Sequence, residues 1–371
     1  MNKAIIYLTN LTHVNNNVHS TETIPLNIGY LATFVKKVSK DQVEVKLFNL
    51  HSDLKKAVDE KKPDILGFSN YAWNSNLSYH YASLYKEKIP EIITVMGGPN
   101  YSYKPERQEV YLKKRSSIDF YIAGDGEIAF SNLIDACMQH QMNIDGVKQE
   151  KINGCHYMRK GAFIANGPSE RLKDMTQLPS PYLEGRLDKF LENGFTPIVQ
   201  TNRGCPFSCS FCCCGTGYYN RIAFFDMQHV QNELEYITKR AKSPSLHIAD
   251  SNFGMYSRDY EICTEIKKVQ EVYGWPVFIN VCTGKNSKER IVKCVELLGP
   301  TIAMSAAVQS TSNIVLKNIK RDNISLSDFW EIQVKLKELG GYSSSDVILP
   351  LPGETLSSYL KGIKSLMEAD I

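Results

Sequence analysis

Five cysteines crowded between positions 205 and 214 are the residues whose types and spacing most clearly indicate chemistry. Three of them, Cys205, Cys209 and Cys212, follow the spacing C-x3-C-x2-C in one segment. Cysteine thiolates are the side chains that hold iron–sulfur clusters. Three thiolates on a four-iron cluster leave one iron without a protein ligand, which gives an incoming molecule an open coordination site. Gly204 and Pro206 predict that this segment is a loop.

Other uses of these thiols have to be weighed. A structural zinc site needs four nitrogen or sulfur ligands, commonly from two closely spaced pairs. Cys213 and Cys214 could contribute, but the sequence offers no second Cys/His pair with zinc-like spacing, and His229 and His247 are isolated. Redox-active or simply buried thiols are a further alternative, and the roles of Cys213 and Cys214 stay open. The five cysteines elsewhere are expected to be small buried hydrophobic residues. The concentration of thiols in a long chain favours a metal site in a reducing compartment over a disulfide framework.

The segment Cys205-Pro-Phe-Ser-Cys209-Ser-Phe211-Cys212, with an aromatic residue before its last cysteine, resembles the signature of the radical S-adenosylmethionine (SAM) superfamily. The resemblance implies a 4Fe-4S cluster on Cys205, Cys209 and Cys212, with SAM bound at the open iron and Phe211 bordering its adenine. It also implies reductive cleavage of SAM to methionine and a 5′-deoxyadenosyl radical. In such enzymes the cofactor carries the chemistry, while the protein supplies positioning and excludes water.

Segments further along the chain resemble the same superfamily. They end at or near predicted strand ends, where barrels of this kind bind ligands. By resemblance the SAM-binding candidates are Phe211, Asp250, Asn280, Gln309, Ser310 and Arg321. Three of them have a plainer alternative: a turn or helix cap for Asp250, a buried amide for Gln309 and a solvated charge for Arg321. Pro352-Gly353-Glu354 also resembles a family turn, although Glu354 could simply lie in the first turn of a helix.

The elements that would carry these residues form two series of strands and helices. Strand-like apolar runs in the first part of the chain alternate with amphipathic, helix-like stretches, and this pattern predicts a parallel sheet covered on both faces. The expected strands span residues 4–8, 43–48, 65–68, 92–96 and 120–123. Five strands in this order predict a flavodoxin-like, doubly wound domain over residues 1–145. Glycines and a Pro-Ser-Pro segment then predict a hairpin and linker over 146–194.

The second series predicts a partial (β/α)6, TIM-like barrel over residues 195–371. Its expected strands span residues 196–201, 246–249, 277–281, 302–308 and 346–349. The chain stops where a sixth strand should begin, so we expect a chain that has been cut short. An open barrel edge of this kind exposes apolar surface, which we expect near residues 347–349 and on the last helix.

The N-terminal domain also resembles cobalamin-binding domains, and its position ahead of a radical SAM barrel resembles the layout of cobalamin-dependent radical SAM enzymes. Glycines at strand ends allow a ligand to approach the backbone, and strand ends are where such sheets bind ligands. The candidates for cobalamin contact are Ser69, Tyr71, Gly97, Gly98, Pro99, Gly124 and Glu127. The family's first motif, D-x-H-x-x-G, fails here because Leu11 and Asn16 stand where Asp and Gly belong. His13 is therefore either a lower axial ligand or an exposed loop residue, and the domain could also bind nothing.

The function that this sequence favours is a cobalamin-dependent radical SAM methyltransferase or cyclase. The alternatives are a methylthiotransferase-like or other cobalamin-independent radical SAM enzyme, and a non-catalytic metal-binding protein. Cys137 alone precedes the linker, which argues against the second cluster of a methylthiotransferase. A net charge of +3 and the lack of a long apolar run argue against nucleic acid and membrane partners. We expect a cytoplasmic protein with a small-molecule or peptide substrate, which Tyr218 and Tyr219 could contact, and an electron donor such as flavodoxin or ferredoxin.

Overall fold

The computed structural model describes residues 3–15, 18–19, 21–284, 286–305, 307–322, 325–341 and 343–368. The chain forms two compact units. The first consists of Met1–Lys173 with Gln177–Leu187, and the second of Asp174–Thr176 with Asp188–Ile371.

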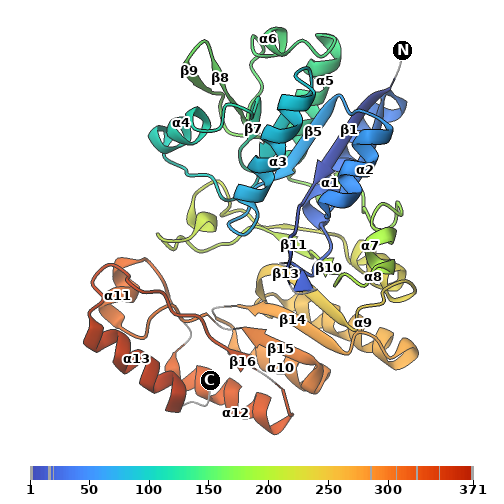
Figure 1. The fold of residues 1–371 in the computed structure, drawn as a ribbon. Coiled ribbons are helices and arrows are strands. Elements are labelled where there is room, and N and C mark those ends of the chain that lie inside the picture. Colours follow the sequence, from blue (N-terminus) through green and yellow to red (C-terminus); the bar gives the residue numbers. More distant parts are fainter. Residues whose placement is uncertain are drawn as a thin grey trace. The chain divides into compact units, whose positions relative to one another are not determined.

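The first unit is built on a seven-stranded sheet (Figure 1). Its five parallel strands lie in the order β4 (Val43–Phe48), β1 (Ala4–Thr9), β5 (Ile65–Ser69), β6 (Ile93–Gly97) and β7 (Phe120–Ile122). In chain order this is 2-1-3-4-5, the flavodoxin-like arrangement, in which ligands bind beyond the carboxyl ends of the strands near β1 and β5. The predicted fold class is confirmed.

Two antiparallel strands extend this sheet beyond β7. They are β8 (Cys155–Arg159) and β9 (Ala162–Ala165), the hairpin predicted from the sequence. Its place differs from the expectation, because β8 pairs with β7 through Tyr121 and His156 and so belongs to the sheet of the first unit. Pairing satisfies the backbone groups that β7 would otherwise leave at an open edge.

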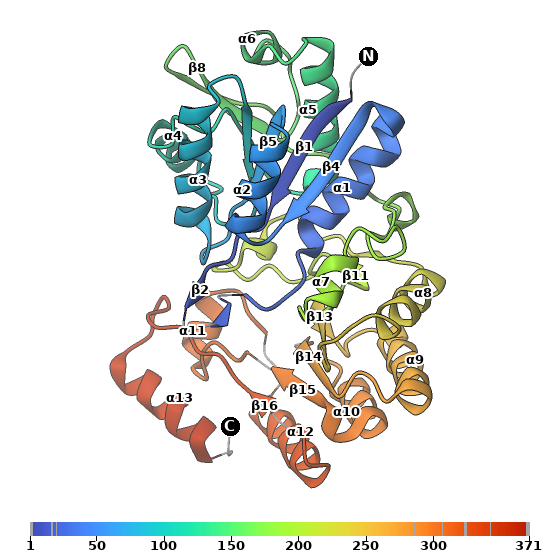
Figure 2. The same ribbon diagram turned by 45° about the vertical axis from the view of Figure 1, so that its right-hand side comes forward.

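Helices cover both faces of this sheet. Tyr7, Leu66 and Phe68 pack with buried side chains of α2 (His51–Glu60), α3 (Ser75–Lys88) and α4 (Pro105–Lys113). Ile6 and Leu8 point to the opposite face because side chains alternate along a strand. They are buried as well, and α1 (Leu26–Ser39) and α5 (Gly126–Gln139), which contact one another and the sheet, lie there. Figure 2 shows the same helices from another side. The shorter elements are β2 (Val14–Asn15), β3 (Val18–His19), η1 (Lys40–Gln42) and α6 (Ile144–Val147).

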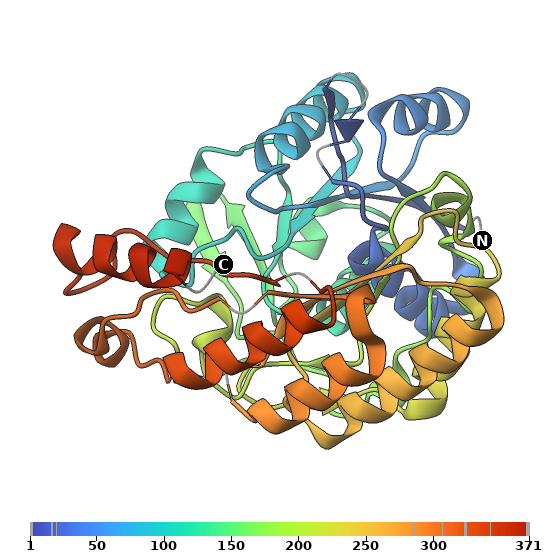
Figure 3. The ribbon, with the colours of Figure 1, turned by 90° about the horizontal axis from the view of Figure 1, so that it is seen from below.

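The second unit is a βα series with a parallel sheet, as predicted. Its strand order is β10 (Ile198–Val199), β13 (Ser245–Phe253), β14 (Phe278–Thr283), β15 (Ile302–Ser305) and β16 (Ser343–Ser344). The helices α8 (Met227–Thr238), α9 (Ser257–Tyr273), α10 (Lys288–Leu298) and α12 (Leu326–Glu338) pack in that order. They form the row of yellow to red helices in Figure 3. The remaining elements are η2 (Met175–Gln177), α7 (Asp188–Glu192), β11 (Asn202–Arg203), η3 (Cys213–Gly215), β12 (Ala223–Phe224), η4 (Gly299–Thr301), α11 (Asn313–Asn318) and α13 (Leu356–Glu368).

The fifth strand is not where the sequence predicted it. The apolar run at 346–349 makes a single bridge, between Val347 and Gln309, while β16 lies earlier at Ser343–Ser344. Val347 and Ile348 instead pack in two small clusters of apolar side chains. The prediction was wrong because an apolar run of this length fits a buried strand and a packed loop equally well.

Apolar surface near the C-terminal helix is exposed, as expected from the sequence. Leu349 and Leu360 are each 55% exposed, and Met367 is 70% exposed. On β14 the side chains of Phe278, Asn280 and Cys282 are exposed, whereas the residues between them are buried. Within the described residues, no helix is long and apolar enough to cross a membrane.

Candidate metal centre

The cysteine loop follows the first strand of the second unit and is closed at its base. Asn202–Arg203 (β11) pairs antiparallel with Ala223–Phe224 (β12). The Phe225 amide donates to the Thr201 carbonyl oxygen at 3.0 Å. The ends of the loop are therefore held together, and the thiols between them are kept in one place.

Close backbone contacts shape the inside of the loop. Gly204 has a φ of +116°, and a Cβ there would lie 2.4 Å from the Arg221 carbonyl oxygen. A Cβ on Gly215 would lie 2.1 Å from the carbonyl oxygen of Cys209. Glycine is required at both positions because any larger residue would collide with backbone atoms.

Two signature thiols are buried and have polar neighbours from distant parts of the chain. Cys205 and Cys209 are 3% and 2% exposed, and Cys212 is half-buried. The Asn252 amide nitrogen donates to the Cys205 sulfur at 3.3 Å. The nearest Arg321 guanidinium nitrogen lies 4.0 Å from the Cys209 sulfur. Two of the three predicted cluster ligands thus each have a neighbouring group that stabilises negative charge on sulfur.

Arg321 reaches this loop because of the turn that ends α11. Lys320 has a φ of +53°, and the Arg321 amide bonds back to the Leu316 carbonyl oxygen. The loop is joined to the same turn, since the Ser210 amide donates to the Ile319 carbonyl oxygen at 2.9 Å. The guanidinium carbon of Arg321 lies 5.9 Å from the centre of the Phe211 ring. The structure therefore brings together Phe211 and Arg321, two of the six predicted SAM-binding residues.

Asp250 supports the entry to the loop. Its buried carboxylate accepts hydrogen bonds from the amides of Thr201 and Asn202, from the Asn202 side chain at 2.6 Å and from the Thr201 hydroxyl. Burial raises the pKa of Asp250 to about 7. These contacts fit the plainer alternative for Asp250, a structural turn residue, better than direct contact with SAM. The carboxylate binds the backbone that leads into Cys205.

Gln309, Ser310 and Asn280 have different surroundings. The Ser310 hydroxyl donates to Glu354 at 2.8 Å, so Glu354 contacts a predicted site residue besides lying before a helix. Gln309 has a φ of +66°, and its buried side-chain oxygen has no hydrogen-bond partner among the described residues. Asn280 lies on the exposed face of β14.

Cys213 and Cys214 form a compact group with Cys212. The three sulfur atoms lie within 4.8 Å of one another, and those of Cys213 and Cys214 are 3.9 Å apart. Such close spacing suits ligands of a single ion, because zinc–sulfur bonds are about 2.3 Å long. Thiolates of a four-iron cluster bind different irons and so stand further apart. Cys212, Cys213 and Cys214 could therefore bind a single zinc ion, which is the alternative to the cluster. Cys212 belongs to both sets of ligands.

In the first unit, the predicted cobalamin residues lie at the carboxyl edge of the sheet, and the protein itself bonds several of them. The Ser69 hydroxyl donates to the Asn10 side chain at 2.7 Å. The hydroxyl of Tyr121 donates to the Gly98 carbonyl oxygen at 2.7 Å and accepts from the Asn70 side chain at 2.8 Å. Gly98 has a φ of +136°, and a Cβ there would lie 2.6 Å from the Asn70 carbonyl oxygen. These glycines therefore allow two loops of the protein to approach one another. We call Gly97, Gly98 and Pro99, with Asn70 and Tyr121, the glycine turn.

An aromatic pair stands beside this turn. Tyr71 stacks on Trp73, with ring centres 4.4 Å apart, and Trp73 is 51% exposed. Gly124, with a φ of +81°, and Pro99 are exposed, whereas Glu127 is buried in the first turn of α5. His13 is exposed, and Asn16 of the failed motif lies outside the described residues. The sequence reasoning missed Trp73, Asn70 and Tyr121, although an aromatic residue two positions after Tyr71 was a usable signal.

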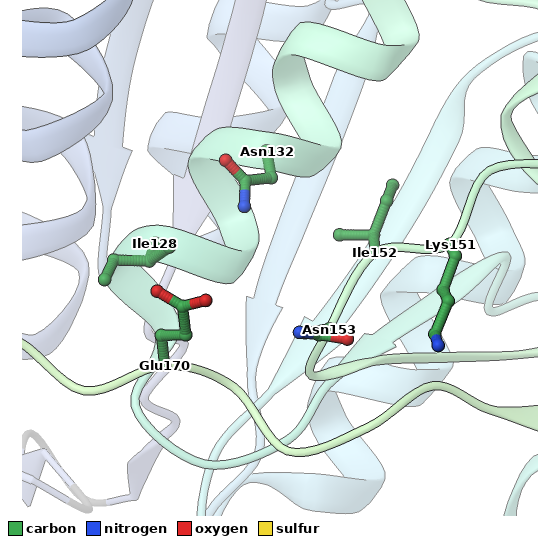
Figure 4. Close-up of a pocket in the computed structure, with 6 residues that line it drawn as sticks. All are labelled: Ile128, Asn132, Lys151, Ile152, Asn153 and Glu170. Atoms are coloured by element: carbon green, nitrogen blue, oxygen red, sulfur yellow. The ribbon is translucent and has the colours of Figure 1, made fainter.

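A cavity of about 230 Å³ lies elsewhere in the first unit (Figure 4). Its lining comes from α5, from the segment before β8 and from the chain near position 170, and it contains none of the predicted site residues. The lining residues are Ile128, Asn132, Lys151, Ile152, Asn153 and Glu170.

Comparison with known proteins agrees with this geometry. Residues 12–134 match the family model of the B12 binding domain, and residues 199–365 match that of the radical SAM superfamily. The chain belongs to the radical SAM superfamily and carries a B12-binding domain ahead of the radical SAM domain. These families imply a 4Fe-4S cluster, SAM and cobalamin as cofactors.

Two curated relatives are similar along most of the chain. The cobalamin-dependent radical SAM methyltransferase TokK of Streptomyces tokunonensis is 33% identical over 322 residues, covering 83% of this chain and 45% of TokK. The 2-(S-pantetheinyl)-carbapenam-3-carboxylate methyltransferase of Streptantibioticus cattleyicolor is 29% identical over 363 residues, covering 93% of this chain and 51% of that protein. The chain thus spans about half the length of these relatives.

Solved structures share the fold at low sequence identity. The radical SAM methyltransferase TsrM from Kitasatospora setae matches with a TM-score of 0.75 and 15% identity, over 99% of this chain and 72% of that chain. The cobalamin-dependent SAM radical enzyme OxsB matches with a TM-score of 0.72 and 18% identity, over 98% of this chain and 52% of that chain.

The donor and acceptor groups present fit these cofactors. Three thiols suit the cluster, and the buried side-chain oxygens of Asn252 and Gln309 have no partner among the described residues. SAM carries an ammonium group and ribose hydroxyls, which are the donors that such oxygens need. For cobalamin, the exposed ring of Trp73, which stacks on the half-buried Tyr71, offers an apolar surface beside the glycine turn.

Proposed function

We propose that the chain comprises the cofactor-binding domains of a cobalamin-dependent radical SAM methyltransferase that acts on a small molecule. The observation that carries the proposal is the convergence of Asn252 and Arg321 on the thiols of Cys205 and Cys209. A structural thiol needs no such partners, whereas a thiolate that holds a redox cluster is stabilised by hydrogen-bond donors and positive charge.

The names of the relatives support this reaction type. Two similar proteins are named as methyltransferases. The anaerobic magnesium-protoporphyrin IX monomethyl ester cyclase of Rubrivivax gelatinosus is 23% identical over 89% of this chain, so a cyclase is the second candidate. The cysteines of the first unit, Cys137 and Cys155, are both fully buried in its core and do not suit a second cluster.

Each residue has a stated part in this proposal. Cys205, Cys209 and Cys212 hold three irons, and Arg321 lies where it can pair with the SAM carboxylate while Phe211 borders the adenine. Gln309 accepts a hydrogen bond from the ribose, and Asp250 and Ser310 position the backbone around the site. When bound, the cluster supplies the electron that cleaves SAM, and cobalamin carries the methyl group. Asn280, on the exposed face of β14, would line the space for SAM.

For the first unit we propose that cobalamin lies over the carboxyl edge of the sheet. Gly97, Gly98 and Pro99 would contact it from one loop, and Ser69 and Tyr71 from another. Gly124, which follows β7, and Glu127, in the first turn of α5, would complete this set. Trp73 would add its exposed ring to this surface.

The partner and the compartment follow from the chemistry. SAM cleavage at a cluster consumes an electron, so we propose a small electron-transfer protein such as flavodoxin or ferredoxin as the donor. All ten cysteines are free thiols, which fits a reducing compartment, and we propose the cytoplasm.

Anaerobic reconstitution with iron and sulfide tests the proposal. Reconstituted wild-type protein would receive SAM, a reductant and hydroxocobalamin, and the products would be separated by chromatography. About four irons and four sulfides per chain are expected, together with 5′-deoxyadenosine and cobalamin that co-elutes with the protein. Cys209→Ala is the matched variant, and it should lose the cluster and the deoxyadenosine but keep cobalamin.

Other results would replace the proposal by one of the alternatives. One zinc per chain without visible absorbance would make the protein a non-catalytic metal-binding protein. A cluster and deoxyadenosine without cobalamin would indicate a cobalamin-independent radical SAM enzyme.

A further inference from the structure

Asn252 lies two residues after Asp250, near the end of β13, at the edge of the sheet that carries the cysteine loop. Alternate residues of this strand are buried, and the series Leu246, Ile248, Asp250 and Asn252 runs from apolar to polar side chains. Asp250 already serves the backbone that leads into the loop. A second buried polar side chain beside it also needs hydrogen-bond partners.

The side-chain nitrogen of Asn252 has such a partner. Asn252 is 2% exposed, and its nitrogen donates to the Cys205 sulfur at 3.3 Å. The two residues are 47 positions apart in the sequence, so the contact depends on the parallel pairing of β10 with β13. The position of Cys205 is fixed further by its own amide, which donates to the Tyr219 carbonyl oxygen at 3.0 Å.

The side-chain oxygen of Asn252 differs from the nitrogen in this respect. The Asn252 side-chain oxygen is buried and has no hydrogen-bond partner among the residues that the structure describes. An unsatisfied buried acceptor destabilises the site as long as no donor reaches it. A ligand that brings a donor to this oxygen removes that destabilisation.

We propose that Asn252 is a positioning residue for both the cluster and SAM. Its N–H donates to the Cys205 thiolate and sets the reduction potential of the cluster, and its side-chain oxygen accepts a hydrogen bond from a donor group of SAM. This inference rests on the proposed function and assigns a residue to that site that the sequence motifs did not indicate.

The direction of the effect on the potential follows from electrostatics. Reduction adds negative charge to the cluster and its thiolates, and a hydrogen bond to a ligand sulfur stabilises that charge. Loss of the Asn252 N–H therefore makes the reduction potential more negative. The cluster should still assemble, because the three thiolates are unchanged.

The test compares Asn252→Leu with Gln309→Leu in reconstituted protein. Both changes remove a side-chain amide whose buried oxygen has no partner among the described residues, but of the two only Asn252 donates to a signature thiol there. The potential is read from the electron paramagnetic resonance signal of the reduced cluster during a redox titration, and SAM affinity from equilibrium binding. Asn252→Leu should retain its iron, shift the potential to more negative values and weaken SAM binding by about tenfold. Gln309→Leu should weaken SAM binding without moving the potential.

An unchanged potential in Asn252→Leu would overturn the inference while leaving the proposed function intact, provided the wild type assembles a cluster and cleaves SAM. Asn252→Asp provides a second measurement in a side chain of the same shape, in case the leucine variant does not fold. Its ionised carboxylate lacks the donor and adds a negative charge, so its potential should also become more negative. A shift in the aspartate variant beside an unchanged leucine variant would assign the effect to charge and overturn the hydrogen-bond role. Failure of the wild type to assemble a cluster or cleave SAM would instead refute the proposed function.

Discussion

The glycine turn of the first unit and the cysteine loop of the second each lie at the carboxyl edge of a parallel sheet. The two regions differ in how their buried polar side chains are hydrogen-bonded. In the glycine turn, Asn70 and Tyr121 bond to each other and to backbone carbonyl oxygens of Asn100 and Gly98. Beside the cysteine loop, Asn252 and Gln309 keep buried oxygens without partners in the described structure.

This difference indicates two ways of preparing a site for a cofactor. The glycine turn is held by the protein's own hydrogen bonds, so its shape should not depend on the ligand. The cysteine loop is complete only when a cluster and a donor-bearing ligand are present, because unsatisfied buried groups are costly. The predictions that follow test this contrast, in order of decreasing expected effect.

Gly98→Ala should disrupt the glycine turn. The added Cβ would lie 2.6 Å from the Asn70 carbonyl oxygen in a backbone with φ of +136°. We expect a loss of about 1–3 kcal/mol of stability and loss of cobalamin retention, measured by thermal denaturation and by absorbance after gel filtration. Iron content after reconstitution should stay as in the wild type.

Gly161→Ala is the control, because Gly161 also has a positive φ, of +82°, but nothing within 4 Å of an added Cβ. It should strain its own backbone and keep cobalamin. Equal retention in the two variants would mean that contact with Asn70 does not shape the turn.

Tyr121→Phe should destabilise the glycine turn less than Gly98→Ala does. The ring stays in place, while the hydrogen bonds to Gly98 and Asn70 are lost. We expect a stability loss of about 1 kcal/mol and cobalamin binding weaker by several fold, measured by titration. Tyr157→Phe is the control, because its buried hydroxyl also donates to backbone, at 2.9 Å to Lys148, but away from the turn. Similar stability losses with unequal cobalamin affinities would support the contrast, and equal affinities would contradict it.

The two regions should also differ in pH dependence. Burial raises the pKa of Asp250 to about 7 from an ordinary 3.8. The folded state therefore holds a proton that the unfolded chain releases, and the free energy of unfolding falls as pH rises from about 4 to about 7. Burial raises the pKa of Tyr121 well above 10, so the glycine turn has no such dependence.

Amide hydrogen exchange at Thr201 and Asn202, corrected for intrinsic rates, measures this effect. Protection should fall between pH 5 and pH 7.5 in the wild type and change less in Asp250→Asn. A wild-type profile that is flat over this range would show that Asp250 is ionised throughout.

The smallest effect is expected from Cys213→Ser combined with Cys214→Ser. Neither thiol belongs to the C-x3-C-x2-C signature, and Cys213 is exposed. Iron and sulfide content should match the wild type, whereas Cys212→Ser should lose the cluster. Loss of metal in the double variant would support a single-ion site on Cys212, Cys213 and Cys214.

Local patterns were sufficient for much of the fold. The strand predicted at 43–48 appears at its predicted position, and the predicted hairpin forms within residues 146–194. Hydrophobic periodicity is a property of neighbouring residues, so it can be read without the rest of the chain. The run at 346–349 was misassigned because its apolar residues pack in clusters whose members, such as Val308 and Val315, are mostly distant in the sequence.

The sequence by itself determined the class of site, because C-x3-C-x2-C is a local arrangement that places three thiols in one loop. The tertiary structure alone decided which groups surround those thiols. Asn252 and Arg321 lie 47 and 112 residues from the cysteines that they contact. Tyr121 likewise reaches Gly98 across 23 residues. Contacts of this kind arise from strand pairing and from the turns that end helices, so no spacing in the sequence records them.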